Sequence, residues 1–212
     1  MMFLLEYWIL NYKNYFDKYT SVLTNNGWKR LKDVNLDNDL IAQFNSDFSI
    51  SFEKGSNYSC VDYSGILITI TSSLGLSLLT VTPDSQIPYL EYTDEGSTHK
   101  IDYIHNINLD RNNYLYTTGK RDIQNIPELY FDRTYTKDEL DAIQAEGVLK
   151  GYSVIINDNE TSAYYLETNT APFDSNDIIK STYEDKIYTL SVPSGMMVTR
   201  RINKVVIGCT NV

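Results

Sequence analysis

YFDKYTSVLTNNGW (residues 15–28) is the stretch of the sequence that decides the fold. It contains a short run suited to a pleated sheet, Val22-Leu-Thr24, followed by Asn25-Asn-Gly27, a turn in which glycine tolerates a positive φ. Three further short apolar runs follow at 31–34, 40–44 and 48–52, separated by Asp-Asn and Asn-Ser pairs. Strands spaced roughly every eight to twelve residues are typical of all-β proteins. The sequence therefore predicts a mainly β fold.

The rest of the chain continues the same pattern. Residues 66–71 and 77–82 flank a turn rich in Ser and Gly and predict a hairpin, and strand-like runs follow at 114–119 and 187–207. The uncharged stretch around this hairpin carries many hydroxyl side chains. It is therefore interpreted as two strands, and no transmembrane segment is predicted.

One region favours a helix. Thr136 fits an N-cap, and Glu139 stands three residues later, as in a capping box. Leu140 and Ile143 have helical spacing, and Gly147 is the expected stop.

Composition narrows the possible functions. The chain has 212 residues, 42% of them apolar and 22% charged, which fits one folded domain. Its formal charge of −10 argues against general binding to nucleic acid or anionic membranes. The basic cluster Arg200-Arg201-Ile-Asn-Lys204 could contact phosphate, but in an acidic chain we expect these residues to pair with the protein's own carboxylates. The 18 tyrosines suit either a half-buried sheet or exposed anchors for a partner.

No residue pattern in the sequence indicates a metal or cofactor site. Cys60 and Cys209 belong to no CxxC pair, and His99 and His105 have no cysteine nearby. No metal site and no cofactor are expected.

The N-terminal segment MMFLLEYWIL is apolar, but it is short and Glu6 interrupts it. It lacks the basic start and the cleavage site of a secretory signal, so secretion is not expected. We interpret residues 1–14 as a docking segment. Its interface candidates are Phe3, Leu4, Tyr7 and Trp8.

Three outer segments together resemble a known family. Thr20-x-Val22-x-Thr24 with Gly27, then LLTVTPDS (78–85), then IYTLSVPSG (187–195) through Ile207-Gly208 are similar, in this order, to segments of inteins, or Hint domains, of large DNA phages and viruses. Parts of the region between them resemble a remnant of the endonuclease-type insert of such inteins. The resemblance implies a β horseshoe with a small α+β insert. It divides the chain into 1–14 (docking), 15–118 (first part of the Hint-like domain), 119–182 (insert) and 183–212 (closing strands).

The resemblance also identifies the former splicing positions, which are Tyr15, Thr82, Ser85 and Cys209. Splicing needs a Cys or Ser nucleophile at the first position, where this chain has Tyr15. It needs a histidine to protonate the leaving nitrogen, where this chain has Ser85. The last step needs a terminal Asn next to a His, whereas here Cys209 follows Gly208 and the last hundred residues contain no His. The resemblance therefore implies the fold and argues against catalysis, so no catalytic residue is assigned.

The preferred hypothesis is a non-catalytic structural or assembly protein, a minor capsid, decoration or tail component located in the virion and contacting other virion proteins. If it is not in the virion, we expect it in the cytoplasm, without membrane insertion. Two alternatives stay open: a Hint domain with residual autoprocessing, and an acidic regulatory module that binds a basic partner.

Overall fold

A computed structural model describes residues 13–72, 78–110, 112–120, 134–157, 159–166 and 168–211. These residues form sixteen strands and one α-helix, which confirms the prediction of a mainly β fold. The predicted interface candidates Phe3, Leu4, Tyr7 and Trp8 lie outside the described residues. Within the described part, no helix combines the length and the apolar character needed to cross a membrane.

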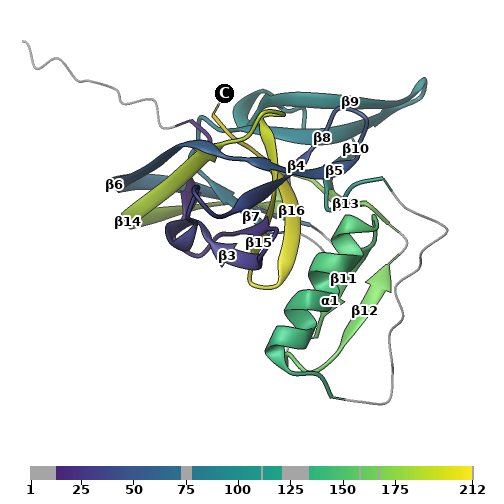
Figure 1. The fold of residues 1–212 in the computed structure, drawn as a ribbon. Coiled ribbons are helices and arrows are strands. Elements are labelled where there is room, and N and C mark those ends of the chain that lie inside the picture. The colour runs from purple at the N-terminus through teal and green to yellow at the C-terminus, as the bar shows by residue number, and fades with distance from the viewer. Residues whose placement is uncertain are drawn as a thin grey trace, which may run out of the picture.

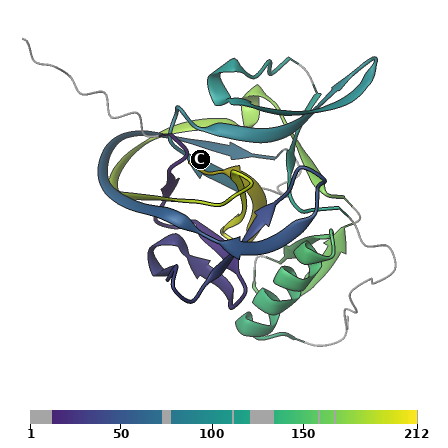
Figure 2. The same cartoon turned by 45° about the horizontal axis from the view of Figure 1, so that its top comes forward.

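A closed barrel of four strands forms the centre of the fold. Its strands are β1 (Phe16–Asp17), β14 (Ile178–Ser191), β6 (Ser56–Thr71) and β7 (Leu78–Val81). The two long strands β6 and β14 pair antiparallel along almost their whole length and curve together in a wide arc (Figure 2). β6 also pairs with β7, which confirms the predicted hairpin.

A second sheet covers one side of this barrel. It runs in the order β16 (Lys204–Cys209), β15 (Met196–Arg201), β2 (Ser21–Thr24), β4 (Leu40–Phe44) and β5 (Ile50–Lys54), with β3 (Gly27–Arg30) paired to β2. The predicted turn between β2 and β3 is present, and Gly27 has φ +89°.

The strand predicted at 31–34 is wrong, because residues Leu31–Asp33 form a 3₁₀ turn. The Leu31 N–H donates to the carbonyl of Thr20, and the Val34 N–H folds back to the carbonyl of Leu31. The buried Leu31 side chain therefore anchors a turn and not a strand.

A four-stranded sheet follows in the order β13 (Thr170–Phe173), β10 (Asn112–Tyr116), β8 (Gln86–Thr93) and β9 (Gly96–Tyr103). Two more 3₁₀ turns, Ile104–Asn106 and Ser175–Asp177, lead out of β9 and into β14. The strand predicted at 114–119 corresponds to β10, which begins and ends earlier than expected.

The helix α1 (Lys137–Leu149) packs on a separate hairpin of β11 (Ser153–Ile156) and β12 (Ala163–Leu166), beside the β sheets (Figure 1). The capping box is confirmed, because the Glu139 N–H donates to Thr136 Oγ1 and the Thr136 N–H donates to Glu139 Oε2. The predicted stop at Gly147 is wrong, since the helix continues for two more residues. Gly147 is the point where the helix touches β11 and β12: an added Cβ would collide with Val154 and Tyr165.

Three hydrophobic clusters hold these parts together. The first extends from the barrel to the four-stranded sheet, the second lies under β4, β15 and β16, and the third is a small core of α1, β11 and β12. The division of the chain at 118/119 and 182/183 stays a prediction. Within residues 119–182, β13 pairs with β10, and the first residues of β14 pair with β6.

Candidate functional site

The four positions that the resemblance identifies lie at the ends of four strands. Tyr15 directly precedes β1, Thr82 directly follows β7, Ser85 directly precedes β8, and Cys209 ends β16. Strand β1 pairs with β7 through Phe16 and Val81, which brings the first two positions side by side.

The peptide bond between Asn14 and Tyr15 is held by hydroxyl groups. The Tyr15 N–H donates to Thr82 Oγ1 at 3.4 Å, and the Thr82 N–H donates to the Tyr15 carbonyl at 3.0 Å. The Asn14 N–H donates to Ser85 Oγ at 3.0 Å. The two hydroxyls of Thr82 and Ser85 lie 3.0 Å apart and share a further hydrogen bond. All these polar groups are satisfied by hydroxyl or backbone partners.

Sequence reasoning missed two residues of this site, Asn14 and Thr210. Asn14 Nδ2 donates to the Thr210 carbonyl at 3.0 Å, and Asn14 Oδ1 accepts from the Gln86 N–H at 2.8 Å. Asn14 has φ +53°, a conformation that asparagine tolerates better than most residues. The available signal was their place in the sequence, since each of them adjoins a predicted position.

The Tyr15 side chain extends away from its own carbonyl. Its hydroxyl donates to Ser59 Oγ on β6 at 3.1 Å. The carbonyl accepts from Thr82 instead, so the phenol and the carbonyl carbon of residue 15 face different partners.

The Cys209 side chain is 5% exposed, and burial raises the pKa of its thiol to about 12. A thiol with this pKa is neutral near pH 7 and is a weak nucleophile. The next residue, Thr210, is fixed through its N–H, which donates to the Gly195 carbonyl at 2.8 Å. The preceding Gly208 packs against the ring of Phe16, where an added Cβ would lie 2.9 Å from the ring carbons.

Both histidines of the chain have partners elsewhere. His99 Nδ1 lies 3.1 Å from the hydroxyl of Tyr116, and the His105 ring stacks on Tyr103. Burial lowers the pKa of His99. Neither imidazole is among the hydrogen-bond partners of Thr82 or Ser85.

The comparison with solved structures finds inteins. A splice-inactive, GSH-linked variant of the AceL NrdHF class 3 split intein matches with a TM-score of 0.52 and 11% identity, covering 94% of this chain and 99% of that chain. The TvoVMA intein matches with a TM-score of 0.49 and 12% identity, covering 91% of this chain and 96% of that chain. An intein-like domain from Clostridium thermocellum has a TM-score of 0.47 and 11% identity, covering 93% and 99%. No protein-family model matches the chain, and no curated protein matches it either.

Proposed function

The chain has an intein-like Hint fold, and we propose that it is a non-catalytic member of this fold that serves as a structural or assembly protein. The observation that carries the proposal is the chemistry at the Asn14–Tyr15 peptide bond. The groups placed there can hold this bond, but they supply neither a nucleophile nor a proton donor that works near neutral pH.

The first step of splicing is the attack of a side-chain hydroxyl or thiol on the preceding carbonyl. At this position the chain has a phenol, which bonds to Ser59 on a neighbouring strand. Attack would require this hydroxyl to leave Ser59 and reach the carbonyl carbon of Asn14. The Tyr15 side chain therefore supports an anchoring role.

Cleavage of the bond also needs a proton for the leaving nitrogen. The Tyr15 N–H donates to the hydroxyl of Thr82, which in turn hydrogen-bonds to the hydroxyl of Ser85. A serine or threonine hydroxyl does not titrate near pH 7, and both are already engaged in hydrogen bonds. The same hydrogen bonds attach Asn14 and Tyr15 to the loop between β7 and β8. This attachment is consistent with a structural role for the site.

Intact-mass measurement tests the absence of catalysis. We expect the wild-type chain to keep its full mass during incubation with excess dithiothreitol, because no thioester forms. The matched controls are Tyr15→Cys and the double variant Tyr15→Cys with Ser85→His, which return a nucleophile and a proton donor to the same backbone. We expect the double variant to release residues 1–14 on addition of thiol. Release of this fragment from the wild type would overturn the proposal.

The proposed place of action is the virion, through contacts with other particle proteins. The support is the resemblance of residues 187–208 to inteins of large DNA phages and viruses, together with the apolar segment 1–10. Mass spectrometry of purified particles should find the protein, and a chain lacking residues 1–12 should fold but fail to join the particle. Absence from particles, or normal incorporation of the truncated chain, would refute this part. Salt-sensitive capture by a basic partner alone would favour a regulatory module.

A further inference from the structure

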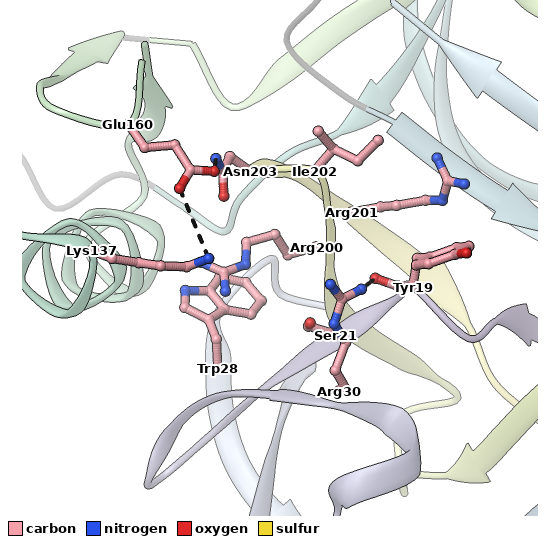
Figure 3. Close-up of a pocket in the computed structure, with 10 residues that line it drawn as sticks. All are labelled: Tyr19, Ser21, Trp28, Arg30, Lys137, Glu160, Arg200, Arg201, Ile202 and Asn203. Atoms are coloured by element: carbon pink, nitrogen blue, oxygen red, sulfur yellow. Dashed lines mark hydrogen bonds and ion pairs between the residues drawn. The ribbon is translucent and has the colours of Figure 1, made fainter. Parts of the chain in front are cut away.

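A pocket of about 490 Å³ lies between the sheet edge at β2 and β3, the turn from β15 to β16, and the start of α1 (Figure 3). Its volume falls in the range of sites for small molecules. It is separate from the site at Asn14 and Tyr15, and neither of those residues lines it. The lining residues that matter for its chemistry are Tyr19, Ser21, Arg30, Lys137, Glu160 and Arg200.

The pocket is cationic although the chain as a whole is acidic. Four of its lining residues carry a positive charge, Arg30, Lys137, Arg200 and Arg201, whereas Glu160 is the single carboxylate in the lining. A local excess of positive charge in a protein of net charge −10 concentrates anions at this place.

Two of the cations are held rigidly by carboxylates behind the pocket. Arg200 binds Asp141 at 2.5 Å and lies over the ring of Trp28, 4.6 Å from its centroid. Arg201 Nε donates to the buried Asp17 at 2.8 Å. These pairs confirm the expected internal pairing of the basic cluster for Arg200 and Arg201. They also fix one wall of the pocket before any ligand arrives, which lowers the entropy cost of binding.

The other two cations keep their charge available. Arg30 is exposed, and its guanidinium donates to the carbonyl of Tyr19; within the described residues it forms no ion pair with a carboxylate. Lys137 reaches Glu160 only at 3.8 Å, and the two side chains are 69% and 46% exposed. Such an exposed pair is weak and easily exchanged for a stronger anion.

The Ser21 hydroxyl adds a hydrogen-bond donor to the lining. Ser21 is buried at the floor of the pocket between Arg30 and Arg200 (Figure 3), and its hydroxyl is a free donor among the residues that the structure describes. The ring of Trp28 forms part of the lining beside Arg200.

We propose that this pocket binds a small phosphate ester, with its phosphate between Arg30 and Lys137. A phosphate monoester carries close to two negative charges at neutral pH, which matches the two cations that lack a strong partner. It also offers several acceptor oxygens for the guanidinium, the ammonium and the Ser21 hydroxyl. The organic part of the ligand would lie against Tyr19 and the exposed Ile202 at the rim.

Calorimetric titration at low ionic strength tests this inference. Inorganic phosphate and adenosine monophosphate are the probes, and adenosine is the uncharged reference. We expect the two phosphate probes to bind and adenosine not to bind. Tighter binding of the nucleotide identifies an ester as the ligand, whereas equal binding of both probes contradicts the ester and supports a free-phosphate site.

Variants locate the site. Arg30→Ala and Lys137→Ala should each weaken binding about tenfold, because each removes a charge-assisted hydrogen bond. Glu160→Gln should tighten binding, since it removes the competing carboxylate. Lys180→Ala, which removes the same charge from an exposed position on β14 outside the lining, is the matched control and should change nothing. Circular dichroism verifies that each variant is folded. No binding by the wild type, or equal weakening by Lys180→Ala, would overturn the proposal.

Discussion

The turn from β15 to β16 holds a strained isoleucine. Arg201 and Lys204 are the last paired residues of the two strands, so Ile202 and Asn203 form a two-residue loop. Both have positive φ, 47° and 60°, as in a type I′ turn. Asparagine suits this conformation, but a β-branched side chain does not. We therefore expect the substitution Ile202→Asn to stabilise the protein.

The magnitude follows from two opposing terms. An L-residue in the left-handed region costs about 1–2 kcal/mol, and asparagine avoids most of this cost. Ile202 is 69% exposed, so removing its side chain sacrifices less than a third of the burial energy of an isoleucine, about 0.5–1 kcal/mol. The net gain in the free energy of unfolding is about 0.5–1 kcal/mol. For a chain of this size, that corresponds to a rise in Tm of about 1–4 °C.

Thermal and urea unfolding of the variant measure this gain. The matched control is Ile179→Asn, the same chemical change at a residue that is 52% exposed but lies in the extended strand β14. There the change relieves no strain and removes a good strand former, so the control should lose stability. If Ile202→Asn also loses stability, or if both variants gain equally, the strain at residue 202 is not the cause and the reasoning fails.

Three further outcomes are expected. Gly147→Ala should destabilise the protein by about 1–2 kcal/mol in urea, because the overlap of the new Cβ with Val154 outweighs the gain in helix propensity; a more stable variant would contradict this packing. Burial opposes ionisation of Asp39, but hydrogen bonds from Lys29 and its neighbours hold the pKa of this carboxyl below its usual value. The ionised Asp39 therefore contributes to the free energy of unfolding above about pH 4, and this contribution is lost as the pH falls further. Asp39→Asn should lower the free energy of unfolding by about 2 kcal/mol at pH 7 and reduce the acid sensitivity of Tm. Iodoacetamide at pH 8 should modify Cys60 and leave Cys209 unmodified until the chain is unfolded, which peptide mapping will show.

The elements that could be predicted from the sequence are those fixed by local chemistry. Thr136 and Glu139 cap a helix through bonds within four residues, and the strand at 40–44 follows from its own composition. The turn at Leu31 has no local signal, because its decisive hydrogen bond goes to the carbonyl of Thr20, just before β2. The sequence predicts a helix end at Gly147, because the contacts of this residue with β11 and β12 arise only in the folded structure.

The candidate sites divide in the same way. The resemblance identifies Tyr15, Thr82 and Ser85, and the structure places all three around one peptide bond. Asn14 and Thr210 act through a contact between residues nearly two hundred positions apart, which no local pattern encodes. The residues that line the proposed phosphate pocket come from four separate segments of the chain. Only the basic cluster that begins at Arg200 is recognisable in the sequence.

The hydrogen bond between Asn14 and Thr210 also determines how the domain responds to mechanical tension. It joins the point where the chain enters the described fold to the point where it leaves, and Figure 1 shows these two places together on one side of the molecule. Force applied at residues 13 and 211 would first pull on this bond and then on the two-residue strand β1. Because β1 pairs with both β14 and β7, the load would then pass through Phe16 and Asp17 into two strands of the barrel.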